Sequence, residues 1–445
     1  MIQKGDKKII RGWVMYDWAN SVYNLVISSS IFPIFYETQT RMVFAEKNGL
    51  KAENVDPNSV TVDFLGMHVS PSVLYSLTLS ISFVLVTFLS PLLSGVADYT
   101  GSKKKFLRFF CYLGSMSAMS LYFFDAHQIE LGMISVLLAS IGYWNSLVFY
   151  NAFLPEIAEP QDQDKVSARG FIMGYLGSML LLLICLGIIM GIDPKFTRIS
   201  FLLVGIWWVG FSQLTYRVLP NNVYNKQPEP GYIWRGFREL KVVFQEFRKT
   251  NRLKKYLRSF FFFNTGVQTV MLMATVFAAK AIEWPGESGK SGLIIAVLLI
   301  QLLGAIGAKI MSIIAIKLEN IRALMISVGI WIVICCCAFF VHKPTEFYFL
   351  AASVGLVMGG VQAIARSTYS KFLPETTDHA SYFSFYDATE KIGIVFGTAF
   401  FALTEFLFDN IRYSIFSVGT FFFLGFIFLF FIPKEENSNF QTNNS

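Results

Sequence analysis

A stripe of polar side chains runs through the first long apolar segment of the chain. Its members recur at i, i+3, i+4, i+7 and i+11, on one face of a helix, and they are Asp17, Asn20, Ser21, Asn24 and Ser28. A carboxylate near the centre of a bilayer costs about 2.5–3.5 kcal/mol on insertion scales, so it normally faces a partner or a cavity. The stripe therefore predicts a helix that lines a polar pathway. The alternative is that Asp17 lies at headgroup level and only orients the helix.

Later apolar segments carry further polar residues that we expect to contact a solute or a coupling ion. They are Tyr150, Asn151, Tyr175, Asn264, Gln268, Gln362, Arg366, Asp387 and Lys391. Arg366 stands about two turns before Pro374, which is deep for an interfacial anchor, although a long arginine side chain can reach the interface from there. Asp387 and Lys391, at i and i+4, also fit a pair that neutralises itself. The two tyrosines and Asn151 fit bonds between neighbouring helices equally well.

Composition places the chain among polytopic membrane proteins. Of the 445 residues, 54% are hydrophobic and only 15% are charged, and the mean hydropathy is +0.51, which is far from a soluble globular profile. Apolar runs near the length of about 20 residues that crosses the hydrocarbon predict an all-α integral membrane fold with twelve transmembrane helices. The runs cover residues 14–36, 72–96, 106–124, 131–153, 170–191, 198–217, 257–279, 291–316, 322–341, 346–369, 383–405 and 411–432.

Basic residues cluster in regions that lie on one side of the expected membrane. Lysine and arginine concentrate at the amino terminus, in the loop after the second expected span and in the central loop. All three regions fall on one side of a chain with twelve spans, which the positive-inside rule makes the cytoplasmic side. We therefore interpret the net charge of +7 as topology and not as a nucleic-acid surface. We expect both termini in the cytoplasm and, in a bacterial cell, a location in the inner membrane.

Cofactor chemistry finds little support in the sequence. The five cysteines lie in apolar runs and their number is odd, which disfavours a disulfide scaffold. The four histidines are scattered, without partners at the spacing of metal ligands. A glycine-rich phosphate loop ending in Lys-Ser/Thr is also missing from the sequence. We expect no metal, no cofactor and no enzymatic activity.

A short repeat divides the chain into two halves. The sequence Phe-Leu-Pro-Glu closes the fourth expected span at residues 153–156 and the tenth at residues 372–375. Repeats in the same orientation predict two six-helix halves related by an axis along the membrane normal, with a site between them near mid-membrane. The expected parts are a first half at 1–217, a connector with an amphipathic helix at 218–255, a second half at 256–433 and a disordered tail at 434–445.

The connector contains an amphipathic pattern. Its apolar side is formed by Trp234, Phe237, Leu240, Phe244 and Phe247, and arginines and lysines occupy most of the other side. This pattern predicts a helix that lies on anionic lipid. A target for a calmodulin-like protein is the alternative.

The loop after the second span carries a superfamily signature. Residues 95–103 read Gly-Val-Ala-Asp-Tyr-Thr-Gly-Ser-Lys, which resembles the Gly-x-x-x-Asp-x-x-Gly-x-Lys/Arg signature of the major facilitator superfamily. The resemblance implies that Gly95 and Gly101 permit a tight turn and that Asp98, with Lys103, belongs to a gate between the halves. We expect Asp98 to interact with the amino-terminal end of span eleven or with Arg169. A solvated loop carboxylate is the alternative.

Further motifs resemble the vacuole-effluxer-like family of that superfamily, which includes a fungal vacuolar amino-acid exporter and bacterial relatives. The motifs cover residues 16–21, 149–156, 167–177, 264–269, 359–367 and 386–391. The resemblance implies a secondary active transporter that moves a small polar solute, such as an amino acid, by alternating access. Many members carry an acidic residue where this chain has Thr265, which removes that position as a coupling site.

The expected partners are a small-molecule substrate, membrane lipid and protons, and we expect a monomer. Proton coupling through Asp17 is a hypothesis, because a carboxylate in a partly dry site can gain and lose a proton as its exposure changes. The sequence leaves two alternatives open. One is a carrier of lysolipids or other amphiphiles, and the other is a membrane sensor or scaffold that binds a solute without moving it.

Overall fold

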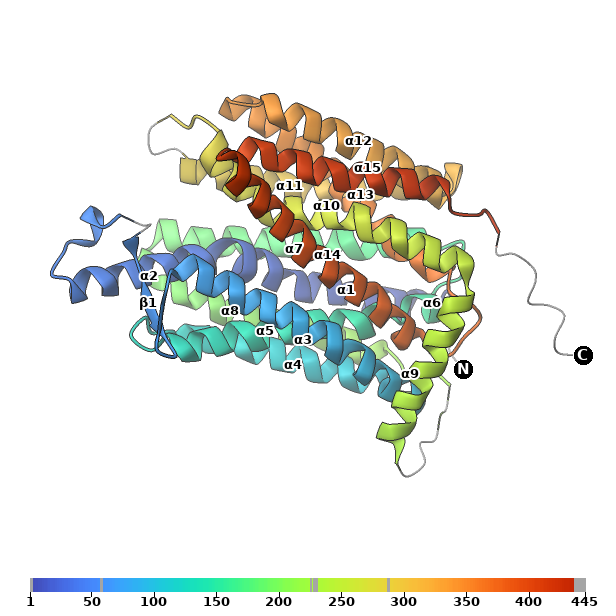
Figure 1. Ribbon diagram of the computed structural model, residues 1–445. Coiled ribbons are helices and arrows are strands. Elements are labelled where there is room, and N and C mark those ends of the chain that lie inside the picture. Colours follow the sequence, from blue (N-terminus) through green and yellow to red (C-terminus); the bar gives the residue numbers. More distant parts are fainter. Residues whose placement is uncertain (1–2, 57–58, 225, 227–230, 286–288, 436–445) are drawn as a thin grey trace, which may run out of the picture.

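The chain folds almost entirely into helices (Figure 1), and the computed structural model describes residues 3–56, 59–224, 226, 231–285 and 289–435. The expected disordered tail falls almost wholly outside the described residues. The first half contains α1 (Lys7–Val22), α2 (Phe32–Lys47), α3 (Pro71–Thr100), α4 (Lys103–Ser120), α5 (Ile129–Asn151), α6 (Leu154–Ile157), α7 (Gln163–Gly191) and α8 (Thr197–Val218). The connector helix is α9 (Tyr232–Lys249), and the second half contains α10 (Asn251–Ala281), α11 (Gly289–Leu318), α12 (Asn320–Phe340), α13 (Pro344–Lys371), α14 (His379–Phe408) and α15 (Ser414–Phe430).

Each expected span corresponds to one helix or to one run of helical segments. In the described chain, ten helices are long and apolar enough to cross a membrane. The other two spans are the run α1–η1–α2, where η1 (Tyr23–Ile31) is π-helical, and α4, which begins with three lysines. The twelve-helix architecture predicted from the sequence is confirmed.

The two halves repeat the same arrangement of helices. In the first half α1 packs against α7 and α8, and in the second half α10 packs in the same way against α14 and α15. The halves meet where α3 and α5 contact α14 and where α7 contacts α11 and α13. Figure 1 shows the second half, in yellow to red, stacked on the first half, in blue to green.

Two small strands lie in the loop that follows α2. The strands β1 (Val62–Phe64) and β2 (Met67–Val69) pair antiparallel across a two-residue turn in which Leu65 and Gly66 both have positive φ. The sequence does not predict this hairpin, because each strand has only three residues and the turn lacks the Asn-Gly or Asp-Gly pair that usually marks such turns. The hairpin marks one end of the bundle, opposite the end at which α9 lies (Figure 1).

Helix α9 packs on the protein more closely than an interfacial helix would. Gly236 faces the backbone of α3, where a Cβ on Gly95 would collide with the Gly236 carbonyl oxygen. Val243 is buried in the same contact, whereas Trp234 is 77% exposed. Trp234 therefore lies outside this contact, which is centred on a glycine that lets the two helices approach. Phe244 and Phe247 reach Phe385 of α14, with ring centroids 5.9 and 5.5 Å apart, so α9 contacts both halves.

Only one of the two signature glycines forms the expected turn. Gly101 ends α3 with φ of +65°, a left-handed conformation that glycine adopts without strain. Gly95 lies inside α3 and serves the contact with α9. The prediction that Gly95 belongs to the turn is wrong, because α3 continues five residues beyond it.

Candidate functional site

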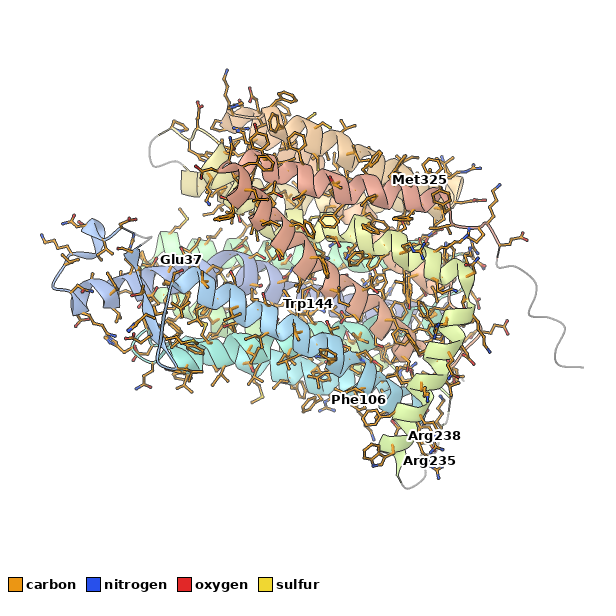
Figure 2. All side chains as sticks on the ribbon, viewed as in Figure 1. Glu37, Phe106, Trp144, Arg235, Arg238 and Met325 are labelled. Atoms are coloured by element: carbon orange, nitrogen blue, oxygen red, sulfur yellow. The ribbon has the colours of Figure 1, made fainter. Side chains whose placement is uncertain are left out.

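A polar cavity of about 450 Å³ lies between the two halves. Its lining extends from Asp17 and Arg366 to Glu37 and Ser72, near the hairpin, so the cavity opens toward the hairpin end of the bundle. Figure 2 shows Glu37 near that end and Trp144 about midway along the bundle. Most of the polar residues singled out in the sequence line this cavity, namely Asp17, Asn24, Asn151, Tyr175, Asn264, Gln268, Gln362, Arg366 and Asp387.

An ion pair across the two halves forms the inner end of the cavity. Arg366 on α13 directs both terminal nitrogens at Oδ2 of Asp17 on α1, at 3.3 Å each. Tyr150 donates to the same oxygen at 2.7 Å. The guanidinium also donates to the Ser167 hydroxyl and carbonyl, at 2.9 Å each, and to Oδ1 of Asn151 at 3.2 Å. Since all of its nitrogens donate to protein atoms, Arg366 is occupied by Asp17 and is not free to hold a solute carboxylate in this state.

Helix packing explains why this ion pair can form. A Cβ on Gly170 of α7 would collide with Oδ2 of Asp17 and come within 2.9 Å of Arg366. The guanidinium also lies over the rings of Phe171 and Trp13, with centroids 4.3 and 4.9 Å away, contacts that favour a cation. The small residue and the aromatic rings thus hold the buried pair in a fixed geometry.

A second charged cluster lies on α14. Lys391 is fully buried and contacts Oδ1 of Asp387 at 2.9 Å and Oε1 of Glu390 at 3.0 Å. Its ammonium group lies 3.5 Å from the ring centroid of Trp144, and Ser90 donates to Asp387 at 3.4 Å. Asp387 and Lys391 are among the residues predicted from the sequence, whereas Glu390 and Trp144 are not. Glu390 stands at i+3 from Asp387, and that spacing was the available signal.

Amide and hydroxyl groups complete the lining. Tyr175 on α7 donates to Gln362 on α13 at 2.7 Å, which is another bond between the halves. Nδ2 of Asn264 is buried and finds no hydrogen-bond partner among the described residues. Asn264 and Gln268 lie one turn apart on α10 and both line the cavity.

Three of the predicted site residues lie behind the cavity wall. Asn20, Tyr150 and Lys391 are fully buried, so the predicted cavity-lining stripe does not hold at Asn20. Tyr150 acts on Asp17, as described above.

Because a π-helix turns less per residue than an α-helix, the segment η1 brings neighbouring residues such as Ser28 and Ser29 to the cavity together. This segment could not be predicted from the sequence, since a π-helix shares the composition of an α-helix.

The opposite end of the bundle is closed by contacts that cross the halves. Asp98 on α3 accepts from the backbone N–H groups of Ala380 and Ser381, at 3.2 and 2.7 Å, in the first turn of α14. This is the predicted interaction of Asp98 with the amino-terminal end of span eleven. Arg169 is exposed and is not among the groups that donate to Asp98 in the described chain, so the alternative pairing is wrong for this conformation.

Two buried clusters extend this closure, and they are related by the repeat. In one, Glu156 of the first half contacts Lys103, and its Oε1 lies 3.0 Å from Nδ1 of His379 on α14, within hydrogen-bond distance. In the other, Asp164 at the start of α7 contacts Lys371 at 2.5 Å and accepts from Asn320 at 2.6 Å, both in the second half. We call these residues together with Asp98 the closing layer. In the sequence, Glu156 stands out only as a member of the repeat at 153–156 and of the family motif at 149–156.

Solved structures identify the class of fold. The human organic anion transporter MFSD10 (TETRAN) is 12% identical, with a TM-score of 0.68 over 96% of this chain and 100% of that chain. The proton:xylose symporter XylE, bound to 6-bromo-6-deoxy-D-glucose, is also 12% identical, with a TM-score of 0.69 over 96% of this chain and 95% of that chain. The fold is that of the major facilitator superfamily.

The chain belongs to the family described as Vacuole effluxer Atg22 like, whose model matches residues 5–441. The uncharacterized MFS-type transporter YxiO of Bacillus subtilis is 28% identical over 436 residues, which cover 96% of this chain and 95% of that protein. Autophagy-related protein 22-1 of Penicillium rubens is 22% identical over 88% of this chain and 84% of that protein. These similarities place the protein among multi-pass membrane transporters and not among enzymes.

Proposed function

We propose that the protein is a secondary active transporter that moves a small polar solute of the amino-acid class by alternating access. The observation that carries the proposal is a polar cavity between two similar halves, open at one end and closed at the other by the closing layer. Alternating access in this superfamily fold requires that the two ends open in turn around a central site. The family description as an effluxer supports export as the direction.

The distribution of charge supports an orientation. Basic residues of α9 and of the start of α4 lie at the closed end, where Figure 2 shows Arg235 and Arg238. Under the positive-inside rule this end faces the cytoplasm. The described conformation is then outward-facing, both termini are cytoplasmic, and in a bacterial cell the membrane is the inner one.

Proton coupling through Asp17 is part of the proposal. The Asp17–Arg366 pair crosses the halves, so it must break when the inner end of the cavity opens. Protonation of Asp17 would remove its charge and weaken its attraction to Arg366, which lowers the free energy needed to separate the halves. A proton entering from the open side would thereby favour the change of conformation.

Uptake into proteoliposomes tests the proposal. The purified full-length protein is reconstituted, a pH gradient is imposed, and accumulation of labelled amino acids is followed with and without the gradient. Accumulation that depends on the gradient supports secondary active transport. Saturable binding with no uptake in either direction would instead support the sensor or scaffold.

A second candidate, a carrier of amphiphiles, is favoured by one observation. An apolar side pocket of about 70 Å³ in the second half shares five lining residues with the main cavity, namely Val270, Met273, Ala274, Ile300 and Val354. A solute with a polar head and an apolar tail would place the tail there. Transport of a fluorescent lysolipid in the same proteoliposomes, unaffected by an excess of amino acids, would favour this function over the first.

A further inference from the structure

The α14 wall of the cavity carries more acid than base. Asp387 and Glu390 both line the cavity, and they share the single ammonium group of Lys391. Two carboxylates against one ammonium leave one formal negative charge in excess. A partly desolvated charge of this kind needs a counter-charge from elsewhere.

The ammonium group of Lys391 is not available to bind a solute. It is 0% exposed, is held between the two carboxylates and lies over the face of Trp144. The carboxylates, in contrast, reach the cavity surface, where their remaining lone pairs accept hydrogen bonds. The wall therefore presents hydrogen-bond acceptors and negative charge to a solute, whereas the ammonium group of Lys391 is buried beneath the cavity surface.

An independent observation concerns Asn264 on the neighbouring helix α10. Asn264 is 4% exposed, lines the cavity, and its Nδ2 lacks a partner among the described residues. An unmet buried donor of this kind destabilises the folded state unless something binds it. The cavity wall at Asn264 therefore contains a buried donor that no described residue satisfies.

Helix geometry places Asn264 and Glu390 at the same level along the cavity. Helices α10 and α14 run parallel, because Gly393 contacts Thr265 and, one turn on, Gly397 contacts Thr269. The rings of Phe260 and Tyr386 stack with centroids 4.2 Å apart. Asn264 and Glu390 each stand four residues after a member of this stacked pair, so they lie at the same level of the cavity.

The rest of the lining does not reverse the sign of this charge. Asp17 and Arg366 neutralise each other, and Glu37 near the open end adds a further carboxylate. A cleft lined by excess charge of one sign concentrates solutes of the opposite sign. The lining thus favours a solute that carries a cationic nitrogen over one that is purely anionic.

We propose that Glu390, with Asp387, forms a cation subsite that receives the ammonium group of the transported solute, and that Asn264 donates to an acceptor oxygen of the same solute. This inference rests on the proposed transport function and narrows its substrate class to amine-bearing solutes, zwitterionic or cationic.

Binding measurements on the purified full-length protein test the subsite. The probes are alanine, leucine and lysine, each paired with its α-N-acetylated form; for lysine, the doubly acetylated form removes both ammonium groups. A ligand that binds the folded state raises the Tm, and titration calorimetry then gives the Kd. We expect at least one amine-bearing probe to bind and its acetylated form to bind at least tenfold more weakly.

The variant Glu390→Gln isolates the contribution of the excess carboxylate. It leaves Asp387 and Lys391 as a neutral pair, so the helix should keep its packing, and it should weaken binding of the amine-bearing probe at least tenfold while leaving the acetylated probe unchanged. Glu390→Asp keeps the charge and should restore part of the affinity. The matched control is Glu405→Gln, which lies on the same helix, pairs with Lys280 and is not part of the cavity lining.

Several outcomes would overturn the subsite. They are equal binding of amine-bearing and acetylated probes, full affinity in Glu390→Gln, or a wild type that binds none of the amines. If Glu390→Gln keeps affinity but loses a pH dependence of binding, Glu390 takes a proton and not an ammonium group. Glu390-dependent binding without uptake into proteoliposomes would reject transport and support the subsite. Equal uptake of amine-bearing and acetylated solutes would support transport and reject the subsite.

Discussion

At the scale of single residues, the Asp17–Arg366 pair is the feature on which the proposed mechanism depends. It is buried, it joins α1 to α13, and Tyr150, Asn151 and Ser167 form further hydrogen bonds with it. A buried pair of this kind is costly to break by removing one partner, because the other charge is left uncompensated. Each member therefore has a distinct predicted phenotype.

Asp17→Asn should abolish accumulation driven by a pH gradient while exchange of solute across the membrane survives. Asparagine keeps an oxygen for Tyr150 and Arg366 but cannot change its charge. Accumulation and counterflow in proteoliposomes measure the two activities separately, and Glu405→Gln, a carboxylate outside the cavity lining, is the control that should keep both. Gradient-driven accumulation at the wild-type level in Asp17→Asn would remove Asp17 as the proton carrier.

Arg366→Lys should be poorly tolerated although the charge is kept. Lysine is a point charge and cannot reproduce the fork that reaches Asp17, Asn151 and Ser167 together. Buried acceptors left without donors cost about 1–3 kcal/mol each, so we expect a lower Tm and transport reduced at least tenfold. Lys309→Arg, on α11, is the reciprocal control, and wild-type transport by Arg366→Lys would contradict the role of the planar guanidinium.

At the scale of elements, α3, α9 and α14 form a unit at the closed end. Asp98 caps the first turn of α14, where backbone N–H groups without a partner in the helix favour a carboxylate. Helix α9 packs against α3 through Gly95 and Gly236. The cap lies between the halves, so it stabilises the conformation in which this end is closed.

Asp98→Asn should loosen the closed end. The variant loses the negative charge that the helix terminus favours, an interaction worth about 0.3–2 kcal/mol. A cysteine at Ser94, which is fully buried one turn before Asp98, reports on opening in a background without native cysteines. We expect faster labelling of Ser94→Cys from the α9 side in Asp98→Asn than in the parent. Equal labelling rates in well-folded proteins would argue against a gating role for Asp98.

At the scale of the whole molecule, the repeat explains the closing layer. Helices α7 and α14 occupy equivalent places in the two halves, and the first turn of each reaches an ion-pair cluster of the opposite half. The hairpin and α9 lie at opposite ends of the bundle (Figure 1), which makes the orientation testable.

Lys51→Cys and Lys241→Cys should label from opposite sides of the membrane. Both lysines are exposed, one near the hairpin and one on α9. In a background without native cysteines, an impermeant thiol reagent added outside intact cells should modify Lys51→Cys and spare Lys241→Cys until the membrane is permeabilised. The opposite pattern would invert the proposed orientation.

The sequence alone determined the class of fold and most of the cavity. Apolar runs of membrane-spanning length and a repeated motif dictate twelve helices in two halves, because a bilayer admits few other solutions for the backbone. Helical periodicity placed Asp17, Asn264, Gln268, Gln362 and Arg366 on faces that the structure brings to one cavity. Local spacing was sufficient for these residues, since each belongs to a regular helix with one polar face.

Tertiary structure alone decided which partner each charge takes. Asp17 and Arg366 are 349 residues apart, Glu156 and His379 are 223 apart, and no local pattern links such pairs. The π-helical segment η1, the burial of Asn20 and the seating of α9 on Gly95 likewise arise from packing between helices. A periodic pattern gives the direction of a side chain from its own helix axis, but a contact also requires the position of the second axis, which only the assembled bundle sets.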